Sequence, residues 1–323
     1  MLEAASHQAL QKEYSLYKER PGKEIYFKVP AITEIPYIPL DALVVSIYSL
    51  PNLDHLPQLP STLKHLTIYD CKALRTLPSL PPGLKSLQLF DMHLEELPAL
   101  PCSLEKLIYH GSTGSAQLPP LPDSITFLNV SSSTEIQCLP NPLPSNLNYL
   151  FCSNTSVEEL PPLPEGLEEL NCNTTKITRL PELPRRLVIL KSRATDITEL
   201  PPLPRHLKTL DCGYTAIREL PDLPFGLCQL YCENTLVHLL PRLPETLCGI
   251  NCKGCPLLLP WDPREDAFLY NLRNLPFREE EASRKRIQGR TRALKEEIAA
   301  AAWHPRRVEA WIAAGGIDIL ETL

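Results

Sequence analysis

Apolar residues return along residues 35–260 with a period of 20 or 21 positions. Each period opens with the pentad Leu-Pro-x-Leu-Pro or a close variant, and eleven such units follow one another. The pentads begin at Ile35, Leu56, Leu77, Leu97, Leu118, Leu139, Leu160, Leu180, Leu200, Leu220 and Leu240. A regular repeat of this length indicates a solenoid in which each unit packs only against its neighbours.

The pattern inside one unit predicts its path. In the unit that opens at Leu200, apolar and polar residues alternate around Leu210 and Cys212, which predicts a short strand with one face inward. Thr215 follows where the chain must turn away, and its hydroxyl can hydrogen-bond the backbone of that turn. The same column holds threonine in five successive units: Thr155, Thr175, Thr195, Thr215 and Thr235.

The pentads predict the return path. Proline fixes φ near −65° and disfavours helix at the preceding residue, so two prolines three positions apart require an extended chain. A unit of this length leaves no room for a full helix on that side. We therefore expect short parallel strands on a concave face and polyproline-like segments on a convex face.

Units of this form closely resemble the leucine-rich repeats of the LPX subclass, which occurs in injected bacterial effectors, and similar arrays in large DNA viruses. The stretch Leu207-x-x-Leu210-x-Cys212-x-x-Thr215-x-Ile217 carries the resemblance, with Cys for the third Leu and Thr for the usual Asn or Cys. The resemblance covers residues 35–260. It implies an α/β-type repeat solenoid, a leucine-rich-repeat horseshoe or superhelix with capped ends.

The chain divides into three segments. Residues 1–34 form the predicted N-terminal helical cap, with an amphipathic helix over residues 3–19 ended by Pro21 and Gly22. Residues 35–260 form the eleven repeats. Residues 261–323 change in character and predict a C-terminal helical cap or tail, with a small docking module as the alternative.

Composition and charge restrict the compartment and the partners. The net charge is −6 and its excess lies in the repeats, which argues against sequence-independent binding of nucleic acid. No apolar stretch has the length of a spanning helix or the form of a secretory signal peptide, so we expect no membrane insertion. Eleven cysteines without such a signal favour reduced thiols and a cytoplasmic location, which is the host cytoplasm if the resemblance extends to the protein's origin.

The cysteines have a structural explanation. Most of those in the later repeats occupy the inward strand position: Cys152, Cys172, Cys212, Cys232 and Cys252. Cys252 and Cys255 also form a C-x-x-C pair, a spacing typical of zinc or redox sites. A four-ligand site would need a second pair on the same side, and Cys255 falls in the threonine column. We therefore expect no metal site and no cofactor.

Catalytic motifs are not found. Some LPX effectors carry a ubiquitin-ligase domain whose nucleophile lies in a Cys-x-Asp motif, and none of the eleven cysteines here has Asp two residues later. H-E-x-x-H, G-x-S-x-G and phosphate-binding glycine loops do not occur. The sequence predicts that the protein is not an enzyme.

Partner binding is predicted on strand residues that point out of the solenoid. One column places aromatic residues on four consecutive rungs: Tyr48, Tyr69, Phe90 and His110. Neighbouring columns add further aromatic and charged residues: Phe127, Tyr149, Phe151, Lys191, Arg193 and Tyr231. Exposed aromatic residues on adjacent rungs are typical of a protein interface. An aromatic ladder that only stiffens the sheet is the alternative.

These patterns predict a non-catalytic module that binds a protein through its concave face, and the resemblance implies a host protein as the partner. The alternative function is a substrate-recognition subunit of a ubiquitin-ligase assembly, with residues 264–323 as the docking segment. A purely structural spacer is a third hypothesis.

Overall fold

The computed structural model describes residues 2–114 and 117–257, which divide into two compact units between Leu167 and Glu168. Each unit is a leucine-rich-repeat solenoid with a parallel sheet, as the period predicts. The predicted C-terminal segment 261–323 lies outside the described residues.

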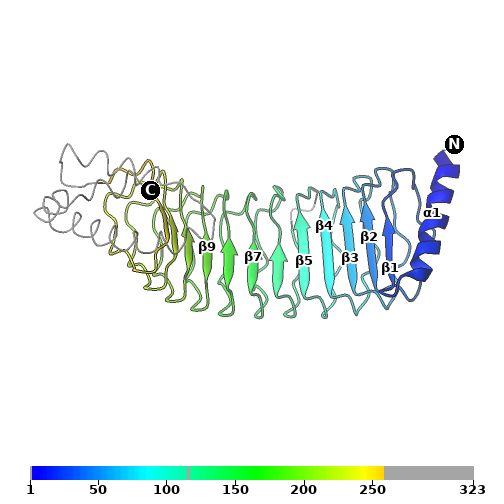
Figure 1. Ribbon diagram of the computed structural model, residues 1–323, viewed down its shortest axis with the longest axis horizontal. Helices are drawn as coiled ribbons and strands as arrows, with labels where there is room; N and C mark the ends of the chain where they lie inside the picture. Colours follow the sequence, from blue (N-terminus) through cyan, green and yellow to red (C-terminus); the bar gives the residue numbers. More distant parts are fainter. Residues whose placement is uncertain (1, 115–116, 258–323) are drawn as a thin grey trace, which may run out of the picture. The chain divides into compact units, whose positions relative to one another are not determined.

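Within each unit the strands lie side by side in chain order (Figure 1). The first unit contains α1 (Leu2–Glu19), β1 (Glu24–Phe27), β2 (Val44–Tyr48), β3 (His65–Tyr69), β4 (Ser86–Phe90), β5 (Lys106–His110), β6 (Phe127–Asn129) and β7 (Tyr149–Phe151). The second contains β8 (Glu169–Asn171), β9 (Ile189–Lys191), β10 (Thr209–Asp211), β11 (Gln229–Tyr231) and β12 (Gly249–Asn251). The eleven predicted repeats supply β2 to β12.

The core follows the apolar columns of the repeat. In the unit that opens at Leu200, Leu207, Leu210 and Cys212 are fully buried, while the pentad residues Leu200 and Leu203 are half-buried. The three-residue strands β6 to β11 direct their central residue inward, and the five-residue strands β2 to β5 direct their second and fourth residues inward. The same columns are thus filled from rung to rung. Burial of these stacked residues is what holds one unit to the next.

The pentads contain neither helix nor strand, in line with the extended return path expected from their prolines. The last proline of each pentad has a further role that the sequence did not suggest. Its carbonyl accepts a hydrogen bond from the N–H three residues later, for example Leu207 N to Pro204 O at 3.0 Å. The resulting turn directs the chain into the strand. All eleven units contain it, at Pro39, Pro60, Pro81, Pro101, Pro122, Pro144, Pro164, Pro184, Pro204, Pro224 and Pro244.

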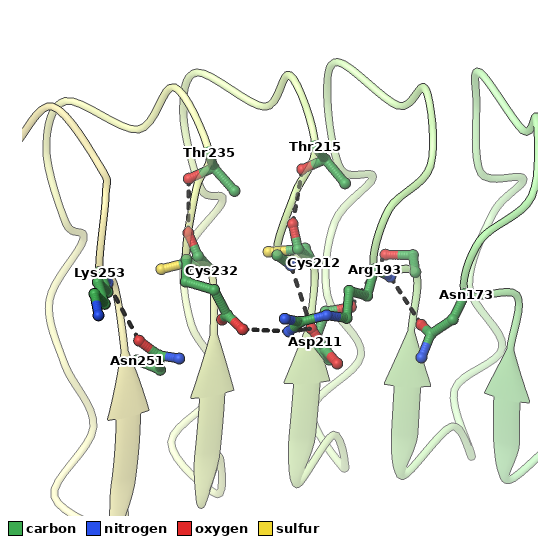
Figure 2. A network of polar contacts seen from close by, with 12 residues as sticks. Asn173, Arg193, Asp211, Cys212, Thr215, Cys232, Thr235, Asn251 and Lys253 are labelled. Atoms are coloured by element: carbon green, nitrogen blue, oxygen red, sulfur yellow. Dashed lines mark hydrogen bonds and ion pairs between the residues drawn. The ribbon is translucent and has the colours of Figure 1, made fainter. Parts of the chain in front are cut away.

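The threonine column closes the turn after each of the strands β7 to β11, as predicted. The Thr215 hydroxyl donates to the carbonyl of Cys212 at 2.7 Å, and Thr235 does the same to Cys232 at 2.9 Å (Figure 2). Thr195 donates to Ser192 O at 2.8 Å, and the two earlier members of the column repeat the contact. These hydroxyls are buried, so each bond satisfies a carbonyl that water cannot reach.

The residue before each of these threonines has a left-handed backbone. Thr174, Ala194, Tyr214 and Asn234 have φ between 52° and 56°, a region that favours glycine. This conformation points the N–H at the next rung, as in Ala194 N to Gly213 O at 2.9 Å. The cross-rung bonds therefore continue beyond the strand, at the expense of local backbone strain.

The amino-terminal end contains an element that the sequence did not predict. The expected amphipathic helix is α1, but β1 follows it and pairs in parallel with β2. The helix α1 lies beside β1, where Glu13 accepts the N–H of Tyr26 at 2.8 Å and the Tyr14 ring packs edge-on against Phe27 (Figure 1). The segment lacks the proline pentad that marks the other rungs, which is why the period did not reveal it.

Replacement Thr195→Val is expected to lower the free energy of unfolding by about 1–2 kcal/mol, because the buried carbonyl of Ser192 loses its hydroxyl donor at little change in side-chain volume. Urea unfolding followed by circular dichroism measures this. Thr198→Val is the matched control, since Thr198 is exposed in the same unit. Equal destabilisation by both variants would contradict the structural role of the column.

Replacement Ala194→Gly is expected to raise the free energy of unfolding by about 0.5–1 kcal/mol, because relief of the left-handed strain exceeds the entropy that glycine adds to the unfolded chain. The control is Ala216→Gly, an exposed alanine that does not have a left-handed backbone, where the same change is expected to destabilise. Thermal unfolding of both variants gives the comparison, and a loss of stability in Ala194→Gly would contradict the prediction.

Candidate protein-binding face

The register of the first unit brings four predicted residues into one line. Tyr48 pairs with Tyr69, Tyr69 with Phe90, and Phe90 with His110, each at the carboxyl end of its strand. We call these four residues the aromatic column. The Tyr69 and Phe90 rings lie 6.0 Å apart at 43°, and Phe90 and His110 lie 6.0 Å apart at 47°. Tilted pairs at this distance attract each other across the strands.

Contact between the rings does not cover the aromatic column. Tyr48 and Tyr69 remain 37% and 42% exposed, and Phe90 and His110 are half-buried. Among the described residues, no aromatic ring packs against that of Tyr48. The column thus combines a partial ladder with apolar surface that still faces water.

A second aromatic group lies on β6 and β7. Phe127 pairs with Tyr149 in the register, and their rings lie 6.0 Å apart. The Phe151 ring lies 5.3 Å from Phe127, and Lys106 Nζ lies 4.8 Å from the Phe127 ring centroid. The lysine cation therefore faces the electron-rich surface of the ring. The structure brings these three predicted aromatic residues together.

In the second unit, the predicted residues Lys191 and Arg193 belong to a group of ion pairs. We call the five residues of this group the charged network: Glu169, Lys191, Arg193, Asp211 and Glu233. Lys191 Nζ lies 2.9 Å from Glu169 Oε1, and Arg193 forms an ion pair with Glu233. Arg193 Nη1 also lies 3.7 Å from Asp211 Oδ1 (Figure 2). The predicted Tyr231 pairs with Asp211 in the register and is half-buried.

Sequence reasoning placed these charged residues on the face but missed their pairing. Arg193 and Glu233 lie 40 positions apart, two units along the same column, so a long arginine side chain can span the rung between them. That intervening rung has Gly213. A Cβ on Gly213 would lie 3.0 Å from the Glu233 carboxylate and 3.2 Å from Arg193 Nη1. The glycine is the signal in the sequence, because a side chain there would crowd both members of the pair.

Asp211 differs from the residues at the equivalent position of nearby rungs. Its Oδ1 accepts the N–H of Gly213 at 3.2 Å, as Asn171 and Asn251 accept the N–H two residues later in their own rungs (Figure 2). Burial raises the pKa of the Asp211 carboxyl, and the Glu233 charge adds to this, against the lowering effects of the Gly213 N–H and Arg193. A neutral amide therefore fulfils the structural role of this side chain elsewhere.

The cysteines of the inward column are buried in the core and form no disulfide among the described residues. Burial raises the pKa of Cys172 to about 12, which keeps the thiol protonated and unreactive. Cys255 is buried as well, and its thiol donates to Cys232 O at 2.9 Å. Among residues 2–114 and 117–257, no group of three or more His, Cys, Asp or Glu residues could hold a metal ion. In the same part of the chain, no helix has the length and apolar character needed to cross a membrane.

Replacement Asp211→Asn is expected to raise the free energy of unfolding, and the gain is expected to grow as the pH rises from about 3 to about 7. The raised pKa means that the folded state carries a disfavoured charge once the carboxyl ionises. Below the unfolded pKa of about 3.9, Asp211 is protonated in both states and its charge contributes no penalty. Urea unfolding at several pH values measures the difference.

The control for this experiment is Asp222→Asn, which changes an exposed aspartate of the second compact unit. Its effect on stability is expected to be small and nearly independent of pH. A gain for Asp211→Asn that shrinks with rising pH would show that attraction to Arg193 outweighs burial, contrary to the prediction.

Comparison with known proteins supports the fold. No protein-family model and no curated protein matches the sequence. Among solved structures, YopM from Yersinia enterocolitica matches 68% of this chain and 53% of its own at 32% identity, with a TM-score of 0.58. YopM from Yersinia pestis, a leucine-rich effector protein, matches 78% and 82% at 25% identity, with a TM-score of 0.56. The chain spans about half the length of the first of these proteins. It is a leucine-rich-repeat solenoid similar to leucine-rich effector proteins.

Proposed function

We propose that the protein is a non-catalytic module that binds another protein through the outward face of its strands, with the aromatic column as a principal contact. The observation that carries this proposal is the alignment of Tyr48, Tyr69, Phe90 and His110 on consecutive strands with their rings partly exposed. Partly exposed aromatic rings in a fixed line offer apolar area at little further loss of side-chain entropy.

The incomplete ladder supports binding over a purely structural role. If stacking alone explained the aromatic residues, Tyr48 would have a ring partner, but among the described residues it has none and stays exposed. Exposed aromatic surface in adjacent positions is costly in water and gains free energy when a partner covers it.

The similarity to a leucine-rich effector protein supports the class of partner. An effector acts on proteins outside its own cell, so we infer that the partner is a host protein. The LPX subclass remains a prediction from the pentads. The ubiquitin-ligase alternative depends on residues 264–323, which lie outside the described residues, and no contact in the described part favours it.

The combined variant Tyr48→Ser, Tyr69→Ser and Phe90→Ser is expected to lose a partner that the wild-type protein retains from eukaryotic cytosol. A single interface aromatic contributes about 2 kcal/mol or more when it is a hot spot, which is a loss of about thirtyfold in affinity. Quantitative mass spectrometry of tagged pull-downs measures the loss, and circular dichroism confirms that the variant folds.

The matched control is Leu40→Ser with Phe225→Ser, which removes large exposed apolar side chains from turns away from the strands. This variant is expected to keep the partner. Identical partner sets for the wild type and the aromatic variant would contradict the proposal. The aromatic column would then only stabilise the sheet by stacking across the strands.

A further inference from the structure

Arg193 is fixed in place from several directions. Its Nη1 donates to Glu233 Oε1 and lies 3.7 Å from Asp211 Oδ1, so two carboxylates hold one edge of the guanidinium. Its backbone N–H donates to Asn173 Oδ1 at 2.8 Å (Figure 2). The charge-assisted contacts with Glu233 and Asp211 restrict the guanidinium to one orientation before any ligand arrives.

Tyr214 supports the same guanidinium from its flat side. Arg193 Cζ lies 4.5 Å from the centroid of the Tyr214 ring, within the range of a cation–π contact. Tyr214 is itself exposed and has φ of 56°, an uncommon backbone for a bulky residue.

The hydrogen-bond donors of Arg193 that lack an acceptor indicate an anionic ligand. Its Nε and Nη2 groups have no acceptor among the described residues, and the side chain is 34% exposed. The carboxylate that orients it is almost covered, with 8% of the Glu233 side chain exposed. Lys191 and Glu169 repeat this arrangement with a half-buried lysine over a more buried glutamate. The cationic side chains of the network are therefore more exposed than its carboxylate side chains.

We propose that the charged network is a docking site for an acidic segment of the protein partner, in which Arg193 and Lys191 bind its carboxylates. This inference rests on the proposed function and adds the chemistry of the bound segment. The buried carboxylates act as positioning groups, because they hold the two cations in place. A planar guanidinium with one free edge matches a carboxylate in a bidentate geometry.

Access favours an acidic partner over a basic one. The network contains three carboxylates and two cations, but the carboxylate side chains are more buried than those of the cations. Glu233 Oε2 is buried without a hydrogen-bond partner among the described residues. It lies 3.0 Å from where a Cβ on Gly213 would be, beneath a guanidinium that a basic ligand would have to displace. The exposed positive edge of Arg193 needs no such rearrangement.

The test is a subtractive selection with the full chain. Short random peptides displayed on phage are retained on the wild-type protein after removal of those that bind the Arg193→Gln and Lys191→Gln double variant. The expected survivors are rich in Asp and Glu, and their affinity, measured with synthetic peptides by fluorescence anisotropy, falls at least about tenfold in Arg193→Gln. Added salt is expected to lower the affinity of these peptides for the wild-type protein.

Two single variants make the result specific. Arg193→Lys keeps a cation beside Glu233, so the ion pair with that carboxylate is retained. The variant loses the planar guanidinium and is expected to lower the affinity for the peptides at least about fivefold. Arg218→Gln removes an exposed arginine of the same unit and is expected to leave their affinity unchanged. Thermal unfolding of each variant shows whether its fold is intact.

The outcomes separate this inference from the proposed function. Surviving peptides that are basic or neutral, or no survivors at all, would overturn the acidic-docking inference. Peptides from a selection on the wild-type protein that depend on Tyr48, Tyr69 and Phe90 but not on Arg193 would also overturn it, while the proposed function stands. Equal losses in Arg218→Gln would reduce the effect to net charge and likewise reject the site.

Discussion

Every feature of this protein depends on the register in which its repeats stack. A unit of 20 or 21 residues is too short to bury its own apolar side chains, so it must place them against the same positions of the next unit. Backbone hydrogen bonds between parallel strands fix that alignment. Equivalent residues of successive repeats then lie side by side within each of the two compact units. Apolar residues become a continuous core, buried threonines become a column of closed turns, and outward residues become columns on the strand face.

The same constraint decides which properties could be predicted from the sequence. The spacing of the pentads was sufficient to place Tyr48, Tyr69, Phe90 and His110 in one line and to give the Thr215 hydroxyl its backbone acceptor, because both follow from the period alone. The strand β1 was missed because it pairs in parallel with β2 like the other strands, but no proline pentad precedes it. The left-handed residues were missed because Ala194, Tyr214 and Asn234 share no side-chain property, and the strain is imposed by the cross-rung hydrogen bond.

The pairing of the charged residues was missed for a different reason. A period describes backbone positions, whereas Arg193 reaches Glu233 by crossing an intervening rung, where Gly213 leaves the space between them open. Side-chain reach and the volume of the intervening residue are not encoded in the periodicity. Any side chain at position 213 would crowd the contact, and a glycine does not. Local exceptions to a repeat therefore carry more information about a site than the repeat itself.

Asp211 shows how such an exception separates function from folding. Asn171 and Asn251 make the same hydrogen bond to the N–H two residues later, so the turn does not require a charge at this position. The carboxylate of Asp211 is nonetheless buried, and burial raises its pKa because the charged form is disfavoured there. Its charge does have a use beside Arg193, where it and Glu233 both face Nη1 of the guanidinium and leave the other donors without an acceptor among the described residues. A charge that the fold can do without, and that fixes the orientation of an exposed arginine, is best explained by what that arginine binds.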